Sequence, residues 1–205
     1  MGDYYGDVSH HYDDDQWAEE EWLEELYSEH IAEFTLERLQ SFYTDNPSVA
    51  QAPLRALGEA REMFAQGYHS AALVFAYIAT EVGIKTALFK PIVYGLVHSD
   101  STAEMVASLA VGRSIDRFRG LLFQILVDYG GIDLRAFTRP GSSRVLWQEI
   151  RNLIDLRNRV IHRAETVTEA QAEDAIAIAS CVLDDIFPNV IQRLDLQLHN
   201  DNIVV

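Results

Sequence analysis

Apolar residues recur at helical spacing along most of this 205-residue chain, and glycines, prolines or capping residues separate the runs. The pattern predicts helices over residues 13–43, 53–66, 70–90, 99–112, 113–130, 143–162 and 166–198. Pro91 is expected to interrupt the third of these helices, and Pro188 to kink the last. No segment shows a convincing strand pattern, so the sequence predicts an all-α, up-and-down type bundle of about six to seven helices.

The single cysteine and the placement of apolar residues limit the class of protein. Cys181 lies in the apolar run IAIASCVL, which predicts a small buried side chain and excludes an intrachain disulfide or a zinc site built on several cysteines. The start of the chain is acidic, unlike a signal peptide, and the longest apolar stretch, residues 71–84, is too short to span a bilayer. We therefore expect a soluble cytoplasmic protein.

Charge is segregated along the chain, whose net charge is −16. Residues 1–37 hold 13 acids and no Lys or Arg, whereas residues 113–163 hold 10 arginines against 5 acids. Of the basic residues 14 are Arg and 2 are Lys, and the guanidinium group suits two-point contacts with phosphate. We predict an acidic tail and amphipathic helix over residues 1–45, followed by the helical bundle over residues 46–205.

The acidic helix permits two interpretations. Its apolar residues Trp22, Leu26, Ile31 and Phe34 can dock it on the bundle while the acids face water. Alternatively, the tethered acids fold back near the arginine-rich segment and restrain access of an anionic ligand, since tethering gives a high local concentration.

The stretch LRNRVIHRAE, residues 156–165, places unusual side chains on a helix. At about 100° per residue, Arg151, Asn158 and His162 share a polar stripe, whereas Arg157 falls in the middle of the apolar side, about 140° from His162. An arginine there requires a buried partner, an interface or a distorted helix end.

This stretch resembles the HEPN superfamily, helical domains that include many metal-independent ribonucleases. Their signature is an arginine, four to six residues and a histidine, often with a polar residue directly after the arginine; here it runs from Arg157 to His162. Residues 56–88 are similar to the family's first helix pair, with a Gly-Tyr turn and then an alanine-rich helix that holds one glutamate, Glu81. The resemblance covers roughly residues 52–190 and implies an RNA substrate, no cofactor and no metal.

The chemistry of RNA cleavage agrees with these residue types. The 2′-OH of RNA is a built-in nucleophile, so cleavage requires proton transfer, which histidine performs at neutral pH, and stabilisation of charge on the phosphate, which arginine performs. The resemblance implies that Arg157 and His162 are catalytic. Asn158 can orient the ring or the substrate, and Arg159 is an alternative phosphate contact because it lies nearer His162 on the helix.

Further residues take supporting roles in this interpretation. Arg151 and Arg163 are expected to bind RNA. Glu81 is either a buried partner of Arg157 or an exposed i,i+4 partner of Lys85. The family's habit of joining two motifs across a homodimer would explain Arg157 on an apolar face.

The sequence leaves other classes of function open. Some HEPN domains are non-catalytic binding or adaptor modules, and an acidic nucleic-acid mimic that inhibits a nuclease would explain residues 1–37. The resemblance implies a toxin or phage-defence effector with an antitoxin or an activating partner. Related toxins modified by their antitoxin carry a tyrosine at the position of Ala164, so that form of control is not expected here.

Overall fold

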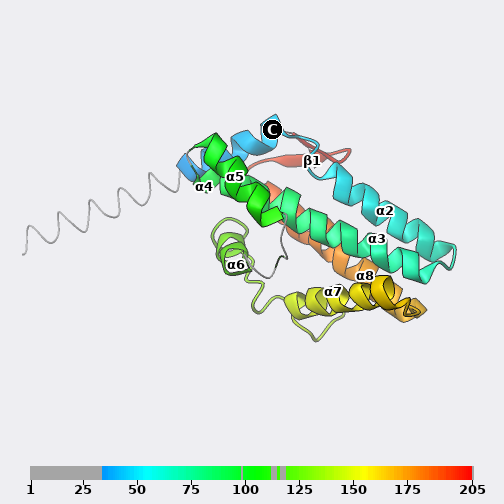
Figure 1. Cartoon of the computed structure of the whole chain (residues 1–205). Helices are drawn as coiled ribbons and strands as arrows, with labels where there is room; N and C mark the ends of the chain where they lie inside the picture. The colour runs from blue at the N-terminus through cyan, green and yellow to red at the C-terminus, as the bar shows by residue number, and fades with distance from the viewer. Residues whose placement is uncertain (1–33, 98, 112–114, 116–118, 205) are drawn as a thin grey trace, which may run out of the picture. The chain divides into compact units, whose positions relative to one another are not determined.

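The computed structural model describes residues 34–97, 99–111, 115 and 119–204 (Figure 1). Contacts divide the chain into two compact units, Met1–Glu37 and Arg38–Val205, and the boundary predicted from the charge pattern falls after residue 45. Most of the predicted acidic helix lies outside the described residues. Residues 34–45 are helical, and this helix ends at the TDNPS segment as predicted.

The second unit is mostly helical, which confirms the all-α class. Its helices are α2 (Gln51–Ala65), α3 (His69–Val82), η1 (Gly83–Phe89), α4 (Lys90–Leu96), α5 (Asp100–Val111), α6 (Arg119–Asp128), α7 (Leu146–Arg163), α8 (Glu169–Ser180), η3 (Cys181–Ile186) and α9 (Phe187–Arg193). Two predicted helix boundaries are confirmed. Gly67 follows α2 with a positive φ of 80°, and Thr168 caps α8 in a capping box with Gln171.

Helix α3 occupies the centre of the unit, with α2 and α8 packed along it and α7 packed against both α3 and α8 (Figure 1). Small side chains make this close approach possible, because Ala72, Ala76 and Ala79 of α3 are fully buried. Gly83 continues the contact, since a Cβ there would lie 2.8 Å from Leu183. The alanine face of α3 is therefore shielded from solvent.

The prediction that Pro91 interrupts a helix is wrong, because His69–Leu96 is continuous through α3, η1 and α4. The π-helix η1 directly precedes Lys90, and Pro91 stands in the first turn of α4. The same order recurs near the C-terminus, where the π-helix η3, which contacts η1, precedes Phe187 and Pro188. A proline in the first turn of a helical segment costs little stability, although it has no N–H to donate. The wider π turn before it accommodates the missing hydrogen bond.

Two short strands near the C-terminus correct the expectation that the chain has none. Strand β1 (Gln197–His199) pairs antiparallel with β2 (Asn202–Val204), and Leu198 lies opposite Ile203. The turn residues Asn200 and Asp201 have positive φ values of 49° and 61°, as a tight hairpin requires. The Ile203 N–H donates to the Pro47 carbonyl at 3.0 Å, which fixes the hairpin beside the start of α2.

The continuous helix His69–Leu96 is the one described segment long and apolar enough to cross a membrane by composition. Of its most apolar window 67% is buried inside the protein. That burial is the property of a core helix in a soluble protein.

Candidate functional site

The motif from Arg157 to His162 occupies the last two turns of α7. Leu146, Ile150, Leu153 and Leu156 bury one face of this helix, and His162 and Arg163 lie in its last turn, where cations are favoured by the helix dipole. The helix ends because Ala164 takes a left-handed conformation, with φ 53°, and its N–H donates to the Arg159 carbonyl. This conformation is costly for a residue other than glycine, so backbone strain is stored directly after the motif.

Arg157 lies over the ring of Tyr77 on α3. Its Cζ atom is 4.7 Å from the ring centroid, which is a cation–π contact, and Tyr77 is buried. Its NH1 group donates to the side chain of Asn158 at 3.0 Å, while its buried Nε has no hydrogen-bond partner in the described part of the chain. The position of an arginine on an apolar face is thus explained by an aromatic partner within the same chain.

Glu81 pairs with Lys85 rather than with Arg157. The Lys85 Nζ lies 2.8 Å from Glu81 Oε1, and the two side chains are 11% and 27% exposed, so the i,i+4 partner is correct but the pair is not on the surface. Glu81 reaches Arg157 indirectly, through Tyr77. The pKa of Tyr77 is raised by burial and by the hydrogen bond that its hydroxyl donates to Glu81. The positive charge of Arg157 lowers the same pKa.

The side chain of Asn158 contacts Arg157. Its side-chain oxygen accepts from the Arg157 guanidinium, so within the described residues the amide does not hold the ring of His162. His162 itself is exposed, and within the described residues it makes no hydrogen bond. The imidazole is therefore open to an incoming ligand.

Arg159 lies on the opposite side of His162 from Arg157. Successive 100° steps place it about 60° from His162, whereas Arg157 lies about 140° away in the other direction. The Arg159 Nε is 3.0 Å from Glu165 Oε2, an ion pair that joins the last turn of α7 to the following segment. Arg151 and Arg163 are exposed on α7. Within one chain, Arg159 thus lies nearer to His162 around the helix than Arg157 does.

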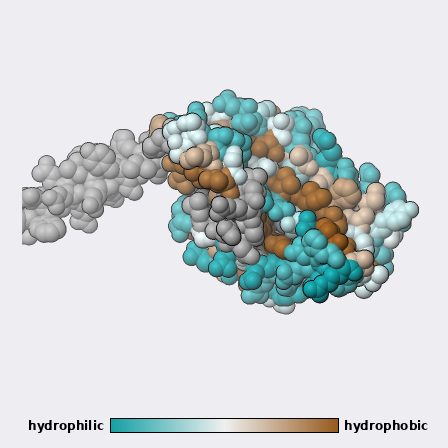
Figure 2. All heavy atoms as spheres, viewed as in Figure 1, coloured by the Kyte–Doolittle hydropathy of each residue, from teal (hydrophilic) through white to brown (hydrophobic). Residues whose placement is uncertain are grey.

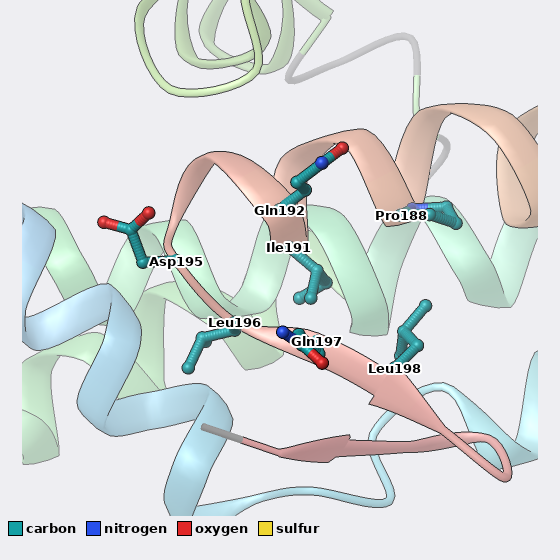
Figure 3. A pocket seen from close by; sticks show the side chains of 7 residues that line it. All are labelled: Pro188, Ile191, Gln192, Asp195, Leu196, Gln197 and Leu198. Carbon is teal, nitrogen blue, oxygen red and sulfur yellow. The ribbon is translucent and has the colours of Figure 1, made fainter.

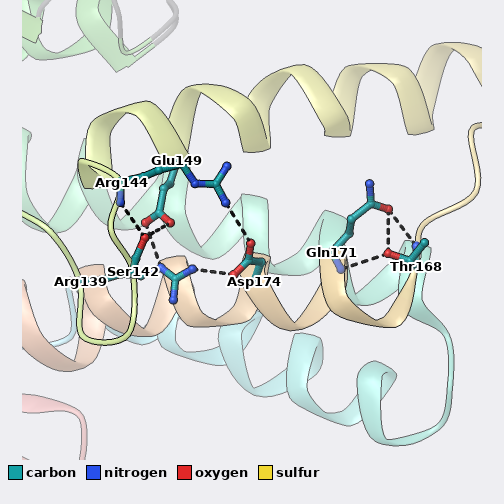
Figure 4. A network of polar contacts seen from close by, with 7 residues as sticks. All are labelled: Arg139, Ser142, Arg144, Glu149, Thr168, Gln171 and Asp174. Atoms are coloured by element: carbon teal, nitrogen blue, oxygen red, sulfur yellow. Dashed lines mark hydrogen bonds and ion pairs between the residues drawn. The ribbon is translucent and has the colours of Figure 1, made fainter.

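A buried ion-pair network that the sequence analysis did not identify fixes the start of α7 (Figure 4). Glu149 is 2% exposed and accepts from Arg139 Nε at 2.9 Å and from Ser142 at 2.7 Å. Arg139 also binds Asp174 of α8 at 2.6 Å. Helical periodicity places Glu149 on the apolar side of α7, as it does Arg157, and this position already indicates a buried carboxylate that needs a partner.

Two clefts differ in their distance from the motif. The first, of about 440 Å³, lies between α9 and β1 and is lined by residues such as Ile191, Gln192 and Asp195 (Figure 3). The second, which we call the α7–α8 groove, has a volume of about 280 Å³ and is lined by Arg144, Glu149, Asn152, Leu153, Leu156, Arg159, Gln171, Asp174, Ala175 and Ile178. Of these two clefts, the α7–α8 groove is the one lined by a residue of the motif, Arg159.

Neither a family model, nor a curated protein, nor a solved structure matches the chain. Among residues 34–97, 99–111, 115 and 119–204, no group of three or more His, Cys, Asp or Glu side chains is placed to hold a metal ion.

Proposed function

We propose that this protein is a metal-independent endoribonuclease, in which His162 transfers a proton and an arginine of the same motif stabilises the reacting phosphate. The observation that carries the proposal is the open imidazole of His162 at the end of α7, with Arg163 exposed and Arg159 partly exposed within one turn of it. Attack of the 2′-oxygen on phosphorus forms a P–O bond, the 2′-proton passes to a base, and the 5′-oxygen leaves with a proton. The products are a 2′,3′-cyclic phosphate and a 5′-hydroxyl.

The test is incubation of the purified protein with mixed RNA in EDTA, wild type beside His162→Ala. His199→Ala is the matched control, because His199 is also an exposed histidine but lies on β1. We expect cleavage by the wild type and by the control, a loss of about 100-fold or more in His162→Ala, and cyclic-phosphate ends. Fragments with a 5′-phosphate and a free 3′-hydroxyl would exclude attack by the 2′-oxygen.

The proposal includes a homodimer in which two motifs meet. Ile161, on the same side of α7 as Arg157, is 46% exposed, and Ile78, next to Tyr77, is 36% exposed. Figure 2 shows a band of apolar surface along α3 on the face in view. Contiguous exposed apolar surface is typical of an interaction site, and a second copy seated here would bring its own motif close to Arg157.

Mixing Arg157→Ala with His162→Ala separates the possible arrangements. If Arg157 of one protomer serves His162 of the partner, both variants are inactive alone, and their mixture contains heterodimers with one intact site, so activity returns. If Arg159 serves His162 within one chain, Arg159→Ala abolishes cleavage, Arg157→Ala alone keeps part of its activity, and mixing it with His162→Ala raises that activity no further. A protein that is fully active as a monomer in light scattering would contradict the dimer.

The biological setting that we propose is that of a cytoplasmic toxin or phage-defence effector, controlled by an antitoxin or by an activating partner. A non-catalytic binding module and an acidic nucleic-acid mimic are the alternatives. RNA binding without cleavage would favour the binding module. Inhibition of a basic nuclease by the intact chain, without binding to RNA, would favour the mimic.

A further inference from the structure

We propose that the α7–α8 groove is a subsite for one unpaired nucleobase of the RNA, next to the phosphate handled by His162. The inference rests on the proposed function and adds a base preference to it. Arg159 lines the groove and lies one helical turn before His162, a rise of about 4.5 Å along the helix. A base in the groove would therefore belong to a nucleotide very close to the scissile bond.

The size and the floor of the groove favour a single ring system. Its volume of about 280 Å³ falls just below the range of about 300–1,000 Å³ for drug-sized ligands, which suits a small, flat group. Leu153 and Leu156 of α7 and Ala175 and Ile178 of α8 are buried and supply apolar walls. Flat bases removed from a stack are held between apolar or aromatic side chains in this way.

Gln171 presents a hydrogen-bond donor whose direction is fixed. Its side-chain oxygen accepts from the N–H and the hydroxyl of Thr168 at 2.9 and 3.2 Å in the capping box. The NH₂ group must then point the other way, and Figure 4 shows it directed toward α7. Across the groove, Asn152 offers a second amide, which has no hydrogen bond within the described residues. Amides that donate and accept match the polar edges of unpaired bases in RNA.

The charges around the groove assign the base to the inside and the phosphates to the rim. Two carboxylates line it, Glu149 and Asp174, and both are bound to Arg139 at 2.9 and 2.6 Å. The negative charges of these carboxylates would repel a phosphate inside the groove, whereas a neutral base would not be repelled. Arg144 and Arg159 stand at the rim with side chains 56% and 40% exposed, where their guanidinium groups can contact the backbone of a strand that enters the groove.

The test measures binding with RNA that cannot be cleaved. Fluorescein-labelled decamers of 2′-O-methyl adenosine, cytidine or uridine lack the nucleophile, and their affinities are measured by anisotropy. We expect the wild type to prefer one base by about tenfold, the effect of one or two hydrogen bonds. Asn152→Ala should reduce the preference to less than about threefold.

Gln171→Glu provides a second variant that keeps the fold, because glutamate also completes a capping box while it removes the donor. The matched control is Gln148→Glu, an identical change at an exposed position in the first turn of α7, outside the groove. Loss of the base preference in Gln171→Glu but not in the control supports the subsite. An unchanged preference in both groove variants, or no preference in the wild type, overturns it.

The outcomes separate the two proposals. A wild type that cleaves RNA with a base preference insensitive to Asn152 and Gln171 retains the ribonuclease and refutes the subsite. A wild type that never cleaves, yet binds decamers with a preference that both variants abolish, refutes the ribonuclease and retains the groove as a base site. If nucleoside monophosphates bind as tightly as the decamers, the groove is a free-nucleotide site and the RNA subsite is wrong.

Discussion

The contact between Arg157 and Tyr77 predicts a measurable coupling free energy between helices α7 and α3. The perturbations are Tyr77→Leu, which removes the aromatic face, Arg157→Met, which keeps the length of the side chain but removes the charge, and the double variant. Cation–π contacts contribute about 0.5–1 kcal/mol at exposed sites and about 2 kcal/mol when desolvated. Because Tyr77 is buried and Arg157 is only partly so, we expect a coupling of about 1 kcal/mol.

Urea unfolding of the four proteins, followed by circular dichroism, gives the coupling as the amount by which the double-variant effect falls short of the sum of the two single effects. A second cycle uses Tyr77→Phe, which keeps the ring but loses the hydroxyl that contacts Glu81. In this cycle the coupling should fall below about 0.3 kcal/mol, because the ring that attracts the guanidinium is retained. Each kcal/mol also corresponds to about 2–4 °C in Tm for a chain of this size.

Two results would refute this reasoning. If the Tyr77→Leu cycle shows no coupling, the ring does not hold Arg157. If the Tyr77→Phe cycle shows the same coupling as the Tyr77→Leu cycle, the hydroxyl and Glu81 hold Arg157 instead of the ring. Under the proposed function, Tyr77→Leu should also slow RNA cleavage, while Tyr77→Phe should remain near wild type, because only the former releases the arginine.

Four further predictions follow from individual groups. Burial raises the pKa of the Cys181 thiol to about 12, so roughly one thiol in ten thousand is ionised at pH 8 and Ellman's reagent should react only after unfolding; rapid reaction of the native protein would contradict this. Ala164→Gly should raise the free energy of unfolding by about 1 kcal/mol, because glycine adopts the left-handed conformation without strain, and an unchanged urea midpoint would argue against strain there. The Tyr94 hydroxyl donates to Glu104 and lowers the pKa of that carboxyl, so the stabilisation is present above the ordinary glutamate pKa and is lost as pH falls through the lowered value; Tyr94→Phe should raise the midpoint in a carbon-detected NMR titration. Deletion of residues 1–37 should speed cleavage, most at low salt, if the acidic arm restrains RNA access, whereas equal or lower activity in a truncated, folded protein would leave the arm a structural role.

The sequence alone determined the positions of the helices, because the signals for a helix are local. Apolar spacing, a glycine after α2 and the Thr168–Gln171 capping box each act within a few residues, so α2 and α7 begin and end, and α8 begins, close to the predicted positions. Helical spacing also predicts that Arg157 lies on the apolar face of α7, although it does not reveal which residue Arg157 contacts. The hairpin was missed because three-residue strands are too short to show alternation, although Asn200 and Asp201 carry the turn signal.

Only the tertiary structure decided which side chains meet. Tyr77 lies 80 residues before Arg157, and Glu149 and Asp174 come from different helices that share one arginine, Arg139. Pro91 is accepted inside a continuous helix because a π segment precedes it. These outcomes depend on how α3, α7 and α8 pack, since the free energy of a buried charge or ring depends on the atoms brought against it from elsewhere in the chain, and the local sequence carries no record of those atoms.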